Sequence, residues 1–279
     1  MLDRQAWMTR IASILALAVL ACSPALAESR EIHDRFNIRF GIVGTDTTTD
    51  LAAGRILGAV VRIEDVLGYE KDDQTFGIQG FYRFKNRQKG RHGIIFSLFD
   101  SRRDSRGVIT ASVPIFDREF IGAFKSSYDT TTFGLGYRYS LVRTEKAEAG
   151  VFAGLSMIKY EFKLAGLVVD PVGGPDIIAA EAADFLAPLP TFGFFLRYAV
   201  TDNLIFDVSA DALDIQVSDI EGRVLNTGTR LSWYFIRNMG ISIGLGSSDI
   251  DVTKTGGSGE LLKINYLQTA YTFSFTFVL

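Results

Sequence analysis

Residues 271–279 read Tyr271-Thr-Phe273-Ser-Phe275-Thr-Phe277-Val-Leu279, which alternates large apolar residues with mostly small ones. Because successive side chains of a strand point to opposite faces, one face is strongly apolar and the other carries Thr, Ser and Val. In a soluble sandwich the apolar face would pack on a core. In a membrane barrel it would meet lipid, and the small residues would line the lumen. The rest of the sequence decides between these two classes of protein.

The first 27 residues have the pattern of a cleaved signal peptide. A positively charged start precedes an apolar segment at 11–21, and this segment is too short and too interrupted to be a membrane anchor. Ala25 and Ala27 supply the small residues that a signal peptidase requires. We therefore expect an exported protein that is cleaved after Ala27.

Cys22 allows a competing interpretation, because Val19-Leu-Ala-Cys22 resembles the sequence at which bacterial lipoproteins are cleaved and lipidated. If cleavage follows Ala27 instead, the mature protein has no cysteine, since the chain contains only one, and it forms no disulfide. The expected organisation is a signal peptide at 1–27, a periplasmic lead-in at 28–35 and one barrel domain at 36–279.

The region after the lead-in reads as a series of amphipathic strands. Twelve are expected, at 36–42, 56–64, 76–84, 91–99, 108–116, 120–142, 151–162, 192–200, 204–215, 229–235 and 241–246, with the last ending at Leu279. Joining the third to sixth of these differently gives ten strands, which is the alternative. Residues 164–186 contain several Pro and Gly, and we expect a long irregular loop there with a short helix.

A bulky stripe recurs in at least six of these strands, at Phe40, Tyr82, Tyr139, Tyr198, Trp233 and Phe275. The opposite faces are mostly Gly, Ser, Thr, Arg or Asp, whereas a soluble sandwich would commonly carry many lysines there. No segment after the signal approaches 18 apolar residues in a row, and without a helix only a closed barrel can cross lipid. The sequence therefore predicts an all-β fold, a single antiparallel transmembrane β-barrel.

The residues Tyr271, Phe273, Phe275, Phe277 and Leu279 resemble the C-terminal assembly signal of Gram-negative outer-membrane barrels. The last residue of that signal is most often Phe, and here it is Leu. The segments 64–68 and 80–84 are similar to those of uncharacterised small outer-membrane barrels. The resemblance implies a place in the outer membrane, with outer-membrane lipid and the barrel-assembly machinery as partners, and it implies no activity.

Eight charged residues are expected to face the lumen: Arg62, Glu64, Arg83, Arg138, Arg197, Asp207, Asp211 and Arg230. Charges in a confined space must pair or stay hydrated, so this set predicts a cross-barrel network. One interpretation is a structural network that plugs and stiffens the barrel. The other is a narrow, weakly anion-preferring pore, because arginines outnumber carboxylates.

An outer-membrane hydrolase that acts on lipids is the alternative function. Such an enzyme needs a general base, most often His, and only His33 and His92 are present. His33 lies in the lead-in before the barrel, and His92 has no serine two residues away and no carboxylate near it in the sequence, so no catalytic residue is assigned. We expect no metal site and no cofactor. The net charge of −3 with scattered positive residues predicts no nucleic-acid partner, and the oligomeric state stays open.

Overall fold

The computed structural model describes residues 35–54, 61–70, 72–84, 90–115, 118–169, 177–217, 220–255 and 261–279. The expected signal peptide, its two candidate processing sites and most of the lead-in lie outside these residues. Among the described helices, none is long and apolar enough to cross a membrane.

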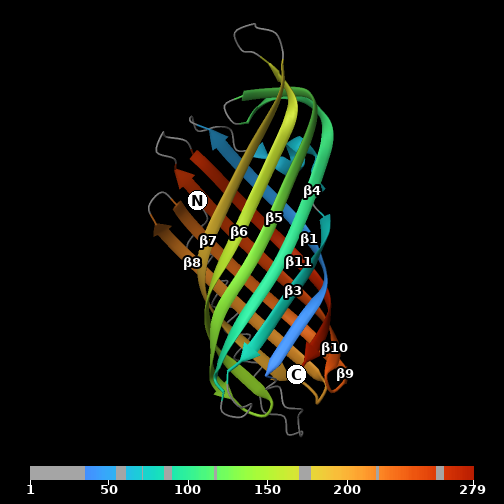
Figure 1. Cartoon of the computed structure of the whole chain (residues 1–279), viewed down its shortest axis with the longest axis vertical. Helices are drawn as coiled ribbons and strands as arrows, with labels where there is room; N and C mark the ends of the chain where they lie inside the picture. The colour runs from blue at the N-terminus through green and yellow to red at the C-terminus, as the bar shows by residue number, and fades with distance from the viewer. Residues whose placement is uncertain are drawn as a thin grey trace.

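Ten long antiparallel strands of the described chain form one closed ring (Figure 1). They are β1 (Phe36–Gly54), β3 (Asp72–Arg83), β4 (His92–Ile115), β5 (Arg118–Arg143), β6 (Ala147–Val169), β7 (Ile177–Ala199), β8 (Leu204–Val217), β9 (Ile220–Ile236), β10 (Met239–Thr255) and β11 (Leu261–Val278). Each strand pairs with the next, and β11 returns to pair with β1. The predicted all-β antiparallel barrel is confirmed.

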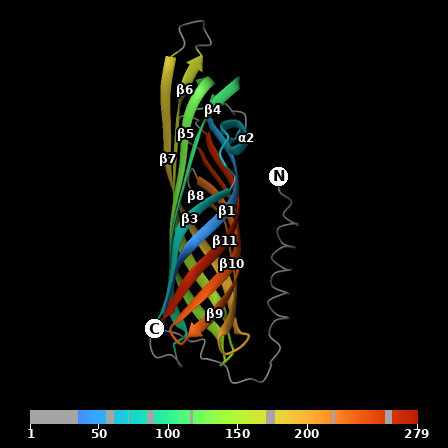
Figure 2. The ribbon, with the colours of Figure 1, turned by 90° about the vertical axis from the view of Figure 1, so that its right-hand side faces the viewer.

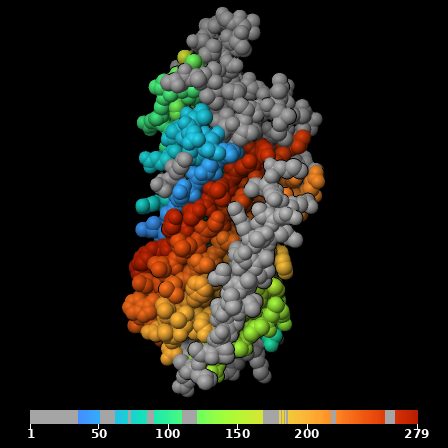
Figure 3. Space-filling model, turned by 180° about the vertical axis from the view of Figure 1, so that it is seen from behind, coloured from blue at the N-terminus to red at the C-terminus, as the bar shows by residue number. Residues whose placement is uncertain are grey.

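The ring closes between the first and last strands. Their register runs from Asn37 opposite Val278 to Gly54 opposite Leu261. At the very end, Phe36 and Leu279 exchange two backbone hydrogen bonds of 3.0 Å. Seen from behind, β11, β10 and β9 cross the surface obliquely as adjacent bands, with β1 beside β11 (Figure 3). Closure satisfies the backbone groups that an open sheet edge would leave unpaired.

The prediction of twelve strands is wrong, and the alternative of ten is right. One reason is the expected strand at 56–64, which does not join the wall. Val61 and Arg62 form the short strand β2, which pairs with β1, and Ile63–Leu67 form the helix α2. Residues 55–60 lie outside the described chain.

The second reason is that the strands expected at 91–99 and 108–116 are parts of the single strand β4. The segment between them contains several charged residues, a composition that favours a turn. In the structure it pairs with β5 without a break from His92 to Ile109. Its alternation is regular, because Ser101, Arg103 and Ser105 are buried while Arg102 and Asp104 are exposed.

The strands β4 to β7 are much longer than the others. They have 24, 26, 23 and 23 residues, against 14 to 18 in β8 to β11. One side of the barrel therefore rises above the rest (Figures 1 and 2). The expected loop with a helix at 164–186 is wrong for 164–169 and 177–186, which extend β6 and β7. Pro188 and Pro190 are tolerated in β7 because its pairing with β8 begins only at Phe192.

The outer face of the wall is apolar and the inner face is small, polar or charged. In β11 the side chains of Tyr271, Phe273 and Phe275 are 57%, 46% and 45% exposed, whereas Thr276 is fully buried. The interior holds an apolar cluster around α2, which lies at the end opposite the C-terminus (Figure 2). The lipid-facing pattern predicted for the closing strand is thus present on its outer face.

Candidate functional site

Buried side chains lie at both ends of the barrel interior. We call the end where Phe36 meets Leu279 the terminal end, and the opposite end, which contains α2, the helix end. Short turns join the strands at the terminal end, including Arg237–Asn238 between β9 and β10. The side chains of greatest chemical interest lie at these two ends and in the space between them.

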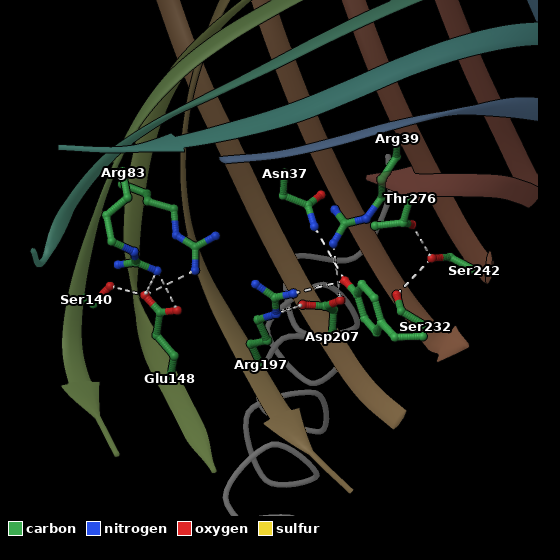
Figure 4. A network of polar contacts seen from close by, with 12 residues as sticks. Asn37, Arg39, Arg83, Ser140, Glu148, Arg197, Asp207, Ser232, Ser242 and Thr276 are labelled. Atoms are coloured by element: carbon green, nitrogen blue, oxygen red, sulfur yellow. Dashed lines mark hydrogen bonds and ion pairs between the residues drawn. The ribbon is translucent and has the colours of Figure 1, made fainter. Parts of the chain in front are cut away.

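Glu148 is the centre of the first charged cluster at the terminal end (Figure 4). Arg83 Nη2 donates to both Glu148 carboxylate oxygens at 2.9 Å, and Arg138 Nη2 lies 3.5 Å from Oε1. The Ser140 hydroxyl also donates to this carboxylate. The side chains of Arg83 and Glu148 are completely buried. Arg83 also donates to the carbonyl oxygen of Gly90 at 3.0 Å, so this pair is satisfied inside the barrel.

Asp207 is the centre of the second cluster, on the neighbouring part of the wall (Figure 4). Its Oδ1 lies 3.4 Å from Arg197 Nε, and its Oδ2 lies 3.7 Å from Arg39 Nη2. The Tyr234 hydroxyl accepts from Arg197 and from Asn37, each at 3.4 Å. Further along, Ser242 bonds to Ser232 and Thr276 at 2.9 and 2.8 Å, and this chain of polar contacts fills the terminal end.

Aromatic rings hold the cationic side chains in place. The guanidinium of Arg138 lies over the ring of Phe195 at 3.6 Å from its centre and over that of Phe81 at 4.4 Å. Such cation–π contacts stabilise a partly desolvated arginine. Arg230 reaches across the lumen and donates to Gln79 Oε1 at 2.5 Å. The lumen at this level is crossed by side chains from opposite walls.

The helix end is filled by α2 and by a buried ion pair. Arg103 Nη1 lies 3.0 Å from Glu64 Oε1, and the backbone N–H of Thr49 donates to Glu64 Oε2 at 2.9 Å. The Arg103 guanidinium also lies over the rings of Tyr69 and Tyr128. Ile63 and Leu67, at the two ends of α2, are almost completely buried.

A left-handed glycine and two hydrogen bonds fix the exit from α2. Gly68 follows the helix with φ of 63°, a left-handed conformation that favours glycine. The Ser105 hydroxyl donates to the Leu67 carbonyl, and the Tyr69 hydroxyl bonds to Ser126. Burial raises the pKa of Tyr69 well above its usual value, so this hydroxyl stays protonated. The segment is therefore folded into the barrel mouth and bonded to the wall.

Between the two ends lies a cavity of about 520 Å³, which we call the chamber. Its lining includes Arg39, Arg138, Arg197, Arg230, Asp207 and Asp211 on the terminal side. It also includes Ile158, Leu189, Val224 and Ile250, which belong to the apolar cluster around α2. The chamber thus has a charged side and an apolar side.

Of the eight charged residues assigned to the lumen, the structure places seven inside the barrel: Glu64, Arg83, Arg138, Arg197, Asp207, Asp211 and Arg230. The assignment of Arg62 is wrong. Its side chain is 47% exposed and pairs with Asp50 and Asp65 at 3.0 and 3.6 Å, because β2 turns it away from the lumen. The seven do not form one ladder, since Glu64 lies at the helix end and Glu148 and Asp207 centre separate clusters.

Three important charged residues were missed by the sequence analysis. Arg39 lies in a strand whose alternation already pointed it inward, so the signal for it was present. Arg103 was hidden in a segment interpreted as a turn, and Glu148 lay in the expected turn between two strands. In both cases a correct strand boundary would have placed the side chain inside.

His92 lies on the outer surface and not in the lumen. It is exposed at the start of β4, bonded to the Tyr137 hydroxyl, and its ring centre lies 5.0 Å from that of Tyr139. His33 lies outside the described residues. The described part of the chain contains no group of three or more His, Cys, Asp or Glu that could hold a metal ion.

No protein-family model matches the sequence, and no curated protein matches it. The outer-membrane protease OmpT of Escherichia coli has a similar structure, with a TM-score of 0.51 and 10% identity over 89% of this chain and 98% of the other. OprG of Pseudomonas aeruginosa also matches, with a TM-score of 0.36 and 12% identity over 91% of this chain and 99% of the other. A third is Ail of Yersinia pestis, with a TM-score of 0.34 and 10% identity over 86% and 99%.

The chain has the fold of a Gram-negative outer-membrane β-barrel. In such barrels the short turns face the periplasm and the longer loops face the exterior. By this rule we expect the terminal end to face the periplasm and the helix end to face the exterior, and we name the two ends accordingly below. The apolar outer face agrees with this membrane location, because it is the surface that lipid would contact.

Proposed function

We propose that this outer-membrane barrel is a closed structural protein, with its lumen blocked at both ends around the chamber. The observation that carries the proposal is the double block. Arg83 and Glu148 are completely buried at the periplasmic end, and Leu67 of α2 is completely buried at the extracellular end. A constitutively open pore would need water-exposed side chains along its whole length.

A narrow, weakly anion-preferring pore is the second candidate. Four arginines and two aspartates line the chamber, so its surface favours anions. In this version of the proposal the barrel conducts only while both blocks are displaced. A lipid-directed hydrolase has little support, because His92 lies on the outer surface, and the protease activity of OmpT belongs to that protein.

Planar-bilayer recordings separate these functions if each block is loosened separately. One variant, Arg83→Ala with Glu148→Ala, removes the buried pair at the periplasmic end. A second, Glu64→Ala with Arg103→Ala, removes the buried ion pair that helps to hold α2 against the wall, and a third combines all four changes. The control is Arg62→Gln, which alters an exposed ion pair.

For a closed barrel we expect no stepwise current from the natural protein, the control or either single-end variant. The four-residue variant should conduct, because only then are both blocks loosened. Stepwise current from the natural protein would overturn the closed-barrel proposal in favour of the pore. Anion preference in that current, lost on neutralising Arg39 and Arg230, would identify the chamber as the selective region.

A further inference from the structure

The chamber separates charge from apolar surface along the lumen. Four lining residues on the periplasmic side are cationic: Arg39, Arg138, Arg197 and Arg230. On the extracellular side, Ile158, Leu189, Val224 and Ile250 are all at most 5% exposed and pack in the cluster around α2. Side chains that only fill and stabilise the lumen would not need charged residues on one side of the chamber and apolar residues on the other.

The positive charge on the periplasmic side exceeds the negative charge that faces it. The two lining carboxylates are already bound, since Asp207 is shared by Arg39 and Arg197, and Asp211 accepts from the Asn226 amide at 2.8 Å. Arg230 faces Gln79, a neutral acceptor. Glu148, just beyond the lining, is shared by Arg83 and Arg138.

Two of these arginines also have donors that no acceptor meets. The buried Nε atoms of Arg39 and Arg138 have no hydrogen-bond partner within the described chain. A buried N–H group without an acceptor is unfavourable, and more so when it belongs to a cation. The arrangement therefore has both charge and hydrogen-bond donors to offer to an anion.

The size of the chamber suits a small organic molecule. Its volume of about 520 Å³ lies within the range of roughly 300–1,000 Å³ that is usual for small-molecule sites. Electrostatic attraction between two charges is stronger inside a protein than in bulk water. An inorganic anion would occupy only the cationic side of this volume.

We propose that the chamber binds one amphipathic carboxylate, with its carboxylate among Arg39, Arg138 and Arg230 and its unbranched apolar tail toward Ile158 and Val224. This inference goes beyond the closed-barrel function, because a closed barrel could equally hold water alone. The carboxylate offsets the excess charge, and the tail takes up the rest of the chamber beside its apolar lining.

Decanoate labelled with ¹³C at the carboxyl carbon is the probe for this site. The full barrel is refolded in its presence, so that the blocked ends do not prevent loading, and is transferred to nanodiscs of deuterated lipid. Native mass spectrometry gives the stoichiometry, and the ¹³C signal reports the carboxylate. Decan-1-ol has the same tail without the charge and serves as the matched ligand.

Two variants test the two sides of the chamber. Arg230→Gln removes one charge and no ion pair of the described network. Gly246→Leu fills the space instead, because a Cβ there meets only Thr227 O at 3.5 Å and Ala270 Cβ at 4.0 Å. Arg62→Gln is the control, and heat-modifiable gel migration checks that every variant folds.

We expect one decanoate per barrel, with binding at least tenfold weaker for decan-1-ol and for decanoate with Arg230→Gln. Gly246→Leu should abolish binding, and the control should bind as the natural protein does. Absence of saturable binding would overturn the inference, as would equal binding of the alcohol or unchanged binding in Arg230→Gln. These outcomes leave the conductance result untouched, so the two proposals can fail separately.

Discussion

Arg83 and Glu148 contribute to the barrel in a way that depends on their partners. Both side chains are completely buried, and Arg138 and Ser140 complete the cluster around the carboxylate. A well-bonded buried pair often adds little net stability over apolar residues of the same size. Removing one member is different, because it leaves a charge that is buried and uncompensated.

Glu148→Ala should therefore lower the free energy of unfolding by about 3–5 kcal/mol. The double variant Arg83→Met with Glu148→Met should lose less than Glu148→Ala alone, because it leaves one fewer charge unpaired. Urea unfolding of the barrel in lipid vesicles, followed by tryptophan fluorescence, measures both. Arg62→Ala, at an exposed pair, should cost at most about 1 kcal/mol. A double variant less stable than Glu148→Ala would contradict this account.

The strand elements were predictable wherever alternation ran without interruption. The closing strand, with Phe273 and Phe275 outward and Ser274 inward, was identifiable from its sequence because large apolar and small residues alternate along it. β4 was split in two because charged side chains on both faces of 101–107 imitate a turn. Those charges are compatible with a strand, because this part of the barrel wall extends beyond the band of outward apolar side chains.

The helix α2 was not predicted, because the sequence around it was interpreted from the alternation of a strand. Residues 63–67 contain Ile63, Val66 and Leu67, and their packing inside the barrel mouth makes a single helical turn stable. Nothing local reveals this, because a five-residue helix has little stability of its own. The same holds for the candidate site. The sequence predicts which charged side chains point inward, but it does not predict which residues of distant strands pair with them.

At the level of β11, we propose that the barrel-assembly machinery recognises its exposed stripe from Tyr271 to Leu279. Leu279 is 67% exposed, and its backbone closes the ring with Phe36. Leu279→Phe should maintain or improve the yield of assembled barrel, whereas Leu279→Asp should reduce it. Heat-modifiable protein in the outer-membrane fraction is the measurement. Lys263→Asp, an exposed change on the same strand, is the control, and an equal loss there would argue against terminal recognition.

The whole molecule is a cylinder with unequal sides. The strands β4 to β7 rise above the other strands, and outward charges such as Arg102 and Lys159 are exposed on them. The ladder of hydrogen bonds is continuous around the ring, including the β1–β11 seam. Such a cylinder resists separation into its strands.

The natural protein should therefore fractionate with the outer membrane and migrate faster in a detergent gel before heating than after it. The compact unheated form reflects the uninterrupted ring, which unfolds only on boiling. Recovery from the soluble periplasmic fraction would contradict the membrane assignment. Equal migration before and after heating would contradict the closed ring.

The inward position of α2 has a consequence for how the extracellular mouth could open. The helix follows directly from β2, which is paired with β1. It is therefore attached to the same end of the barrel that it fills. A helix that stays covalently attached to the barrel has a high effective concentration at its buried position. Its return to that position is a unimolecular event, independent of protein concentration. Any opening by displacement of α2 is thus reversible by construction, and the barrel needs no separate partner to reseal itself.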